Sequence, residues 1–186
     1  MRNFIIFILS LISFISFSQT NEDISMFNEI NKIRKDPKSY ISVVETYIHD
    51  QEVMVNTFGE SKFWSKRIKT AEELINVLKR TKSMDTLSFD TNMYVITKNH
   101  SDYLKESGKY THIGYNNESL DIRFKFIDYK KFLNENIAYS KGNPLLELLL
   151  DIDVPNRGHR MNILNENVKY ISISINDYVV VQNFRD

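Results

Sequence analysis

The chain has 186 residues, 42% of them apolar, and its 24 lysines and arginines are balanced by 24 aspartates and glutamates. This length fits one domain, and a formal net charge of zero argues against a nucleic-acid-binding protein, which needs a basic excess. The absence of cysteine excludes disulfides, thiolate-bound zinc, iron–sulfur clusters and a cysteine nucleophile. A site must therefore be built from histidines, carboxylates, hydroxyls, amides or backbone groups.

The first eighteen residues have the three-part layout of a secretory signal peptide. A short, singly positive start precedes an almost wholly apolar run over residues 4–17, and small or polar residues follow up to Gln19. A retained membrane anchor is the alternative, but this run is shorter than the roughly 20 residues that span a bilayer. We therefore expect a signal peptide over residues 1–18 and a secreted or periplasmic protein, with no membrane span left after cleavage.

Helical patterns dominate the first part of the mature chain. Apolar residues at helical spacing predict a first helix over residues 24–33. A second helix is expected to start at Asp36–Pro37, with aspartate as cap and proline in the first turn, and to bury a stripe within residues 40–48. Residues 49–67 show no clear period, which predicts an irregular connection. The capping-box pattern Thr-Ala-Glu-Glu at 70–73 predicts the start of a third helix.

The second part of the chain combines helices with a terminal pair of strands. Residues 90–105 predict a longer helix with an aspartate cap, closed by Gly108. Residues 110–133 are polar and aromatic, and predict a structured loop. Asn-Pro before residues 145–150 indicates a short buried helix, and alternation over residues 171–184 predicts a β-hairpin. This order of elements favours an α+β fold in layers.

Common catalytic signatures are missing from the sequence. It contains no glycine-rich phosphate loop, no Gly-x-Ser-x-Gly elbow and no His-Glu-x-x-His helix. Two imidazoles and several carboxylates in the second half of the chain form a reasonable donor set for a divalent ion such as zinc. These residues are far apart in sequence, so spacing alone is a weak indication of a shared site. They are His112, Glu135, Asp151, Asp153 and His159.

Short motifs around these residues resemble a known family. Asn-Glu-Asn-Ile-Ala at 134–138 resembles the Gly-Glu-Asn-Ile-Ala signature of the CAP superfamily of SCP-like extracellular proteins. Gly-His-Arg-Met-Asn-Ile-Leu at 158–164 is similar to the bacterial form of that family's second signature. Thr111–His112 matches the family's earlier histidine, and Asn31 and Arg34 fill the Asn-x-x-Arg element of its first helix.

The resemblance implies a fold and a set of site residues. The fold would be an α–β–α sandwich with a three-stranded antiparallel sheet between helical layers, formed by a domain over residues 24–186. The family's cleft holds two histidines and two acidic residues, onto which His112, Glu135 and His159 map directly. The fourth member would be Asp151, and Asp153 lies close enough in sequence to compete with it.

Three functions are compatible with these residues. The first is a binding module whose cleft takes a divalent cation, zinc above all, and whose unknown extracellular ligand is a lipid or a glycan. The second is a metal-assisted hydrolase with Glu135 or Asp151 as general base. The third is a purely structural polar network. Since no hydroxyl nucleophile stands in an activating motif, we favour binding over catalysis, and we expect His100, on the inner face of its helix, to be a hydrogen-bonded core residue.

Overall fold

A four-stranded sheet organises the molecule. The computed structural model describes residues 18–186, so the predicted signal peptide, residues 1–18, lies outside the described residues except for Ser18. The sheet order is β1-β3-β4-β2, in which β4 pairs antiparallel with both β2 and β3, and β1 pairs parallel with β3. The strands are β1 (Ser88–Phe89), β2 (Leu133–Tyr139), β3 (Tyr170–Asn176) and β4 (Val179–Arg185).

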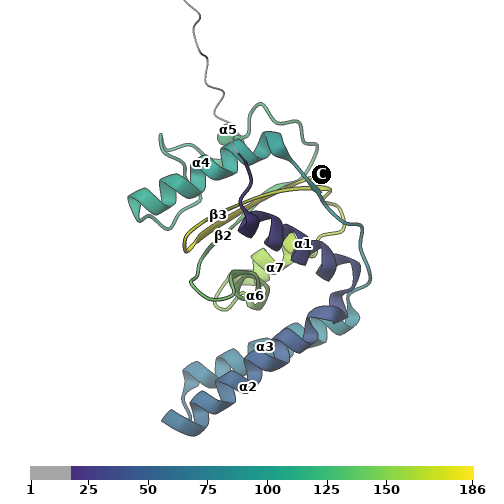
Figure 1. Cartoon of the computed structure of the whole chain (residues 1–186), viewed down its shortest axis with the longest axis vertical. Helices are drawn as coiled ribbons and strands as arrows, with labels where there is room; N and C mark the ends of the chain where they lie inside the picture. Colours follow the sequence, from purple (N-terminus) through teal and green to yellow (C-terminus); the bar gives the residue numbers. More distant parts are fainter. Residues whose placement is uncertain (1–17) are drawn as a thin grey trace, which may run out of the picture.

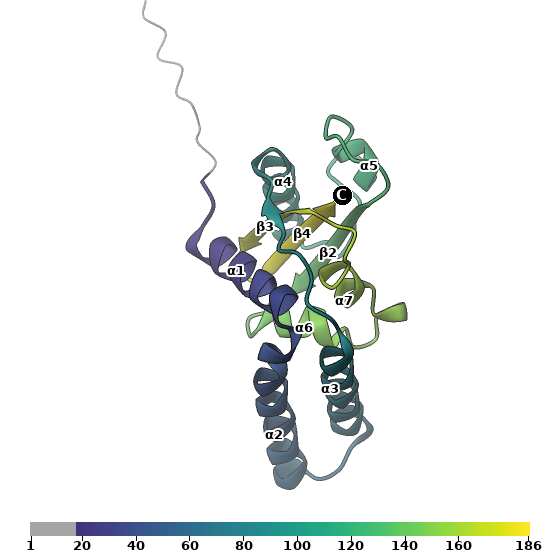
Figure 2. The same cartoon turned by 90° about the vertical axis from the view of Figure 1, so that its right-hand side faces the viewer.

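Helices cover both faces of this sheet. Helix α4 packs on one face, and α1, α6 and α7 pack on the other, while α2 and α3 extend the second layer away from the sheet (Figures 1 and 2). The predicted α–β–α sandwich is therefore confirmed. The α-helices are α1 (Asn21–Lys35), α2 (Ile41–Phe58), α3 (Lys62–Arg80), α4 (Thr91–Ser107), α5 (Leu120–Arg123), α6 (Pro144–Leu150) and α7 (Gly158–Ile163). Within residues 18–186, none of them combines the length and apolar character that crossing a bilayer requires.

Strand alternation separates two packing layers. Ile171 and Ile173 of β3 belong to the larger core under α1, α3 and α6. The intervening Ser172 and Ser174 face α4, where their hydroxyls pair with Thr97 and Ser101. The same two-residue period in β2 and β4 decides which site residues meet which helices.

Several predicted elements have the expected ends. The Asp90 side chain caps α4 by accepting hydrogen bonds from the N–H groups of residues 92 and 93, and Gly108 ends the helix with a φ of 63°. Asn143 caps α6, with Pro144 in its first turn and five leucines buried. The terminal hairpin is also confirmed, with its turn between Asn176 and Val179.

The region before α4 corrects three predictions. Residues 49–67 are helical rather than irregular, apart from a short turn between α2 and α3. Helix α3 is capped by Ser61, so Thr70 is a buried residue inside it and not a cap. A 3₁₀ turn, Pro37–Tyr40, separates Asp36 from α2, and Asp36 makes no capping hydrogen bond with its side chain. The missing period over 49–67 has a physical reason, because an amphipathic period arises only where a helix has a core to face.

The strand count also differs from the prediction. The three antiparallel strands are present, and β1 adds a fourth, parallel one. Its backbone is tied to β3 by hydrogen bonds from Ser88 N–H to Lys169 O and from Asp90 N–H to Ile171 O, both 2.8 Å. Two residues are too few to show the alternation from which a strand is predicted.

Candidate functional site

The first pair of site residues is His112 with Glu135. Strand β2 presents Glu135 toward α4, and the loop after α4 places the His112 ring beside it, with Nδ1 2.9 Å from Oε1. Arg123, at the end of α5, donates from Nη1 and Nη2 to both carboxylate oxygens at 2.9 Å. Asn183 of β4 adds a hydrogen bond of 3.0 Å from Nδ2 to Oε2. The Glu135 side chain is buried, whereas that of His112 is 57% exposed.

These contacts fix the charge of Glu135. Burial alone would raise the pKa of this carboxyl, but hydrogen bonds from His112 and Arg123 and the charge of Arg123 outweigh it and lower the pKa to about 2. Glu135 is therefore ionised at neutral pH and can only accept hydrogen bonds, so the His112 Nδ1–H is the donor. In a neutral His112 ring, the Nε2 atom then carries the lone pair.

His100 lies beside this pair and corrects a prediction. Its ring is buried, as expected, but neither ring nitrogen makes a hydrogen bond within residues 18–186. Its Nε2 lies 3.7 Å from Glu135 Oε1, too far for a hydrogen bond. Burial lowers the pKa of His100 to about 4, although the Glu135 carboxylate acts in the opposite direction. The prediction of a hydrogen-bonded core histidine is therefore wrong, and the ring is a neutral, unpaired core group at neutral pH.

The second pair is His159 with Asp151. Asp151 follows α6 in the left-handed conformation, and its Oδ1 lies 2.8 Å from His159 Nδ1. Its Oδ2 accepts the backbone N–H of His159 at 2.8 Å, in the first turn of α7. Asp151 thus orients the ring and caps the short helix that carries it. Asp153 does neither, since its side chain is 70% exposed and pairs with Lys66.

Unusual backbone angles gather between α6 and α7. Four non-glycine residues within positions 151–157 have φ between 54° and 67°, namely Asp151, Asp153, Asn156 and Arg157. Such conformations cost of order 1–3 kcal/mol each and persist only where the surroundings enforce them. Here Arg157 donates to the Asp151 carbonyl at 2.7 Å, and both Arg157 and Arg160 pair with Glu73 of α3. Glu73, predicted to complete a capping box, instead anchors the connection that sets Asp151 against His159.

Strand β2 stands between the two pairs. Glu135 points to the α4 side, and the next residue, Asn136, points to the α7 side, where its Nδ2 donates to the His159 carbonyl at 3.1 Å. Asn162 of α7 donates in turn to Asn136 Oδ1 at 2.7 Å. Within residues 18–186, no three histidine, aspartate or glutamate side chains are grouped so as to hold a metal ion. The four predicted residues thus form two histidine–carboxylate pairs, His112 with Glu135 and His159 with Asp151.

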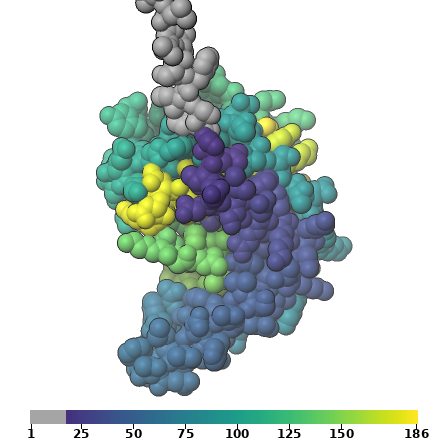
Figure 3. Space-filling view, viewed as in Figure 1, coloured from purple at the N-terminus to yellow at the C-terminus, as the bar shows by residue number. Residues whose placement is uncertain are grey.

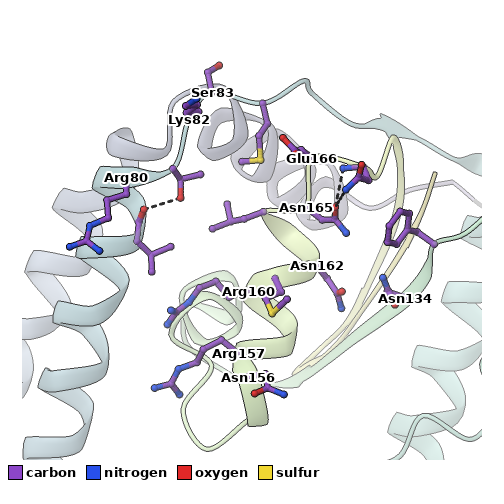
Figure 4. A pocket seen from close by; sticks show the side chains of 17 residues that line it. Arg80, Lys82, Ser83, Asn134, Asn156, Arg157, Arg160, Asn162, Asn165 and Glu166 are labelled. Carbon is purple, nitrogen blue, oxygen red and sulfur yellow. Dashed lines mark hydrogen bonds between the residues drawn. The ribbon is translucent and has the colours of Figure 1, made fainter.

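A cleft of about 1050 Å³ lies next to the second pair. Helix α7 and the start of β2 line one side, and the end of α3 and the segment after it line the other (Figure 4). The lining contains several side-chain amides. An exposed methionine and a phenylalanine also line the cleft. The amide and apolar residues of the lining include Asn134, Asn156, Asn162, Asn165, Asn167, Phe132 and Met161.

Sequence reasoning missed two residues that hold the site. Arg123 lies in the segment predicted only as a structured loop, and Asn183 lies in the terminal strand. Neither belongs to a motif, and only the fold brings them to Glu135. Asn136 and Asn162 lie inside the two family signatures. The sequence did not indicate that their side chains would hydrogen-bond to each other, or that Asn136 would also bond to the backbone of His159.

Comparisons with known proteins agree with this architecture. The model of the Cysteine-rich secretory protein family, CAP, matches residues 27–184, so the chain belongs to this family. A search of curated proteins found no match.

Two solved bacterial structures are similar in fold. An outer surface protein from Borrelia burgdorferi is 15% identical with a TM-score of 0.51, and the match covers 91% of this chain and 96% of the Borrelia chain. An extracellular protein containing an SCP domain from Bacillus anthracis is 20% identical with a TM-score of 0.49. That match covers 68% of this chain, which spans 44% of the length of the Bacillus chain.

Of the four predicted site residues, only the two histidines have a ring nitrogen suited to bind a divalent cation. In each pair a carboxylate binds Nδ1, which is the arrangement that orients metal-binding histidines in proteins and leaves Nε2 as the ligand atom. The oxygens of Glu135 are already occupied by Arg123 and Asn183, and those of Asp151 by His159. The acidic residues therefore fit the role of orienting groups better than that of ligands.

Proposed function

We propose that this protein is an extracellular binding module whose two histidine–carboxylate pairs take a divalent cation, zinc above all, through Nε2 of His112 and His159. The observation that supports this is the bonding of each Nδ1 to a carboxylate, which fixes the tautomer that zinc binding requires. A bound cation would supply a Lewis-acidic position for an anionic or carbonyl group of the ligand. Side-chain amides in the lining of the adjoining cleft can pair with the hydroxyl groups of a glycan.

The state of the carboxylates favours binding over catalysis. A general base works best with a pKa near the working pH. Glu135 has its pKa lowered to about 2 and both oxygens hydrogen-bonded, so it is a poor proton acceptor. Asp151 uses its two oxygens on the ring and the backbone of His159. A metal-assisted hydrolase would need one of these groups released from its partners.

We further propose that the protein acts outside the cytoplasm, either secreted or in a periplasm. The predicted signal peptide supports this location. So does membership of a family described as secretory, with a similar fold in a protein described as an outer surface protein.

Zinc titration of the full chain tests the proposed site. We expect stoichiometric binding by calorimetry at pH 7.5, lost in His159→Ala and in His112→Ala. Asp151→Asn should weaken binding by about 10–100-fold, the usual effect of removing a group that orients a metal-binding histidine. Protons compete with zinc for imidazole nitrogens, so the affinity should be lower at pH 5.5 than at pH 7.5.

His49→Ala is the matched control, since His49 is an exposed histidine of α2. It should bind zinc as the parent does. Equal affinity of His159→Ala and the parent, or a parent that binds no zinc at pH 7.5, would reject the metal site and favour a structural role for the pairs.

A further inference from the structure

The outer half of the α2–α3 hairpin is not part of the domain core. Gln51 is the last buried residue of α2 and Thr70 the first of α3, so residues 52–69 include no buried side chain. This segment projects from the body at the end of the molecule opposite α4 and α5 (Figures 1 to 3). An ion pair between Lys66 and Asp153 ties it back to the body. Apolar side chains at its end are therefore left uncovered.

Large apolar side chains gather at this end, which we call the tip patch: Met54, Phe58, Phe63 and Trp64. Phe58 ends α2 with its side chain 74% exposed, and Phe63, 55% exposed, stands in the first turn of α3. The Trp64 ring packs edge-on against Phe63, with centroids 4.6 Å apart. Soluble domains seldom expose several aromatic rings together unless the surface binds something.

Positive charge surrounds the tip patch. Residues 52–69 carry four basic residues (Lys62, Lys66, Arg67 and Lys69) against two acidic residues, Glu52 and Glu60, in a chain with zero net charge. The Arg67 guanidinium lies over the Phe63 ring, 4.5 Å from its centroid. The first turn of α3 has a lysine and no acidic residue, the opposite of what stabilises a helix N-terminus. Sequences that break such a local rule often do so for a function.

We propose that the tip patch binds the surface of membranes that contain anionic phospholipid. Aromatic rings beside lysines and arginines are typical of protein segments at the membrane–water interface. Insertion of a few side chains is sufficient at such an interface, whereas a stable protein partner needs about 800 Å² per side. A second copy of this chain would also bring two basic segments together.

Trp64 reports directly on this contact, because it is the only tryptophan of the chain. With phosphatidylglycerol-containing vesicles, its fluorescence should shift to the blue and be quenched by brominated lipid, and high salt or pure phosphatidylcholine vesicles should abolish most of the shift. Replacing Lys62 and Lys69 by glutamine should lower vesicle partitioning by roughly 30-fold, from the usual contribution of basic residues near an anionic surface. Phe58→Ser should weaken it as well.

Phe126→Ser is the matched control. Phe126 is 88% exposed with Lys125 over its ring, but it lies on the body of the domain. It should leave the Trp64 signal unchanged. The apolar residues 4–17 are common to parent and variants, so any affinity of theirs cancels in the comparison. No Trp64 shift with anionic vesicles would overturn the proposal, as would equal losses in Phe126→Ser. A shift that depends on protein concentration without vesicles would instead show contact with a second copy.

Discussion

Replacing Arg34 by methionine is expected to lower the free energy of unfolding by about 4 kcal/mol, because it takes a charged donor from three carbonyls, of which that of Ile163 is buried. The Arg34 side chain is fully buried. Its Nε donates to Asp85 O at 3.0 Å, and its Nη1 donates to Ile163 O and Asn165 O, both at 2.9 Å. Burial lowers the pKa of Arg34 to about 10, so it is still charged at neutral pH and its hydrogen bonds are strong.

This effect reaches the candidate site, because Ile163 ends α7, the helix that carries His159. Denaturant unfolding of the parent, Arg34→Met and Arg34→Lys measures it. The Arg34→Lys variant should recover little of the lost stability, since one ammonium group cannot reach both the carbonyl of Asp85 and those of Ile163 and Asn165. Lys35→Met, an exposed neighbour on α1, is the control and should change stability little. A loss below about 1 kcal/mol in Arg34→Met would show that water replaces the guanidinium.

The predictions succeeded where local chemistry alone decides the structure. Helix α4 begins after its cap, Asp90, and ends before Gly108 because of the side-chain and backbone preferences of these single residues. The terminal hairpin follows from the strict alternation of apolar and polar residues. They failed at residues 49–67, because helix prediction relies on a buried face and residues 52–69 of this hairpin bury no side chain. Thr70 was predicted as the start of α3 for the same reason. The first turns of this helix bury no side chain, so their sequence shows no amphipathic pattern.

The site was predictable only through the two signatures. Distances in sequence could not join His112 to Glu135 or choose between Asp151 and Asp153, and the hydrogen bonds of His159 favour Asp151. The partners Arg123 and Asn183 come from a loop and a distant strand, so their roles depend on tertiary structure that no local pattern encodes. Whether the pairs bind a metal stays a prediction.

Glu135→Gln is expected to destabilise the protein by about 3 kcal/mol at pH 7, the usual result of removing one partner of a buried ion pair. Glutamine keeps the size of the side chain but removes the charge that compensates Arg123, and it offers one acceptor oxygen where the carboxylate offers two. His112 would also lose the carboxylate that orients its ring. The variant should therefore bind zinc more weakly as well as unfold more easily.

The pH dependence identifies the origin of this effect. The folded-state pKa of Glu135, about 2, lies below its ordinary value, so its stabilisation is fully present above about pH 5 and is lost as pH falls toward 2. The difference in unfolding free energy between parent and Glu135→Gln should thus shrink by more than half between pH 7 and pH 3. Glu52→Gln, an exposed residue of α2, should match the parent at both pH values. A difference for Glu135→Gln that stays constant with pH would assign its effect to packing rather than to the charge that faces Arg123, His112 and His100.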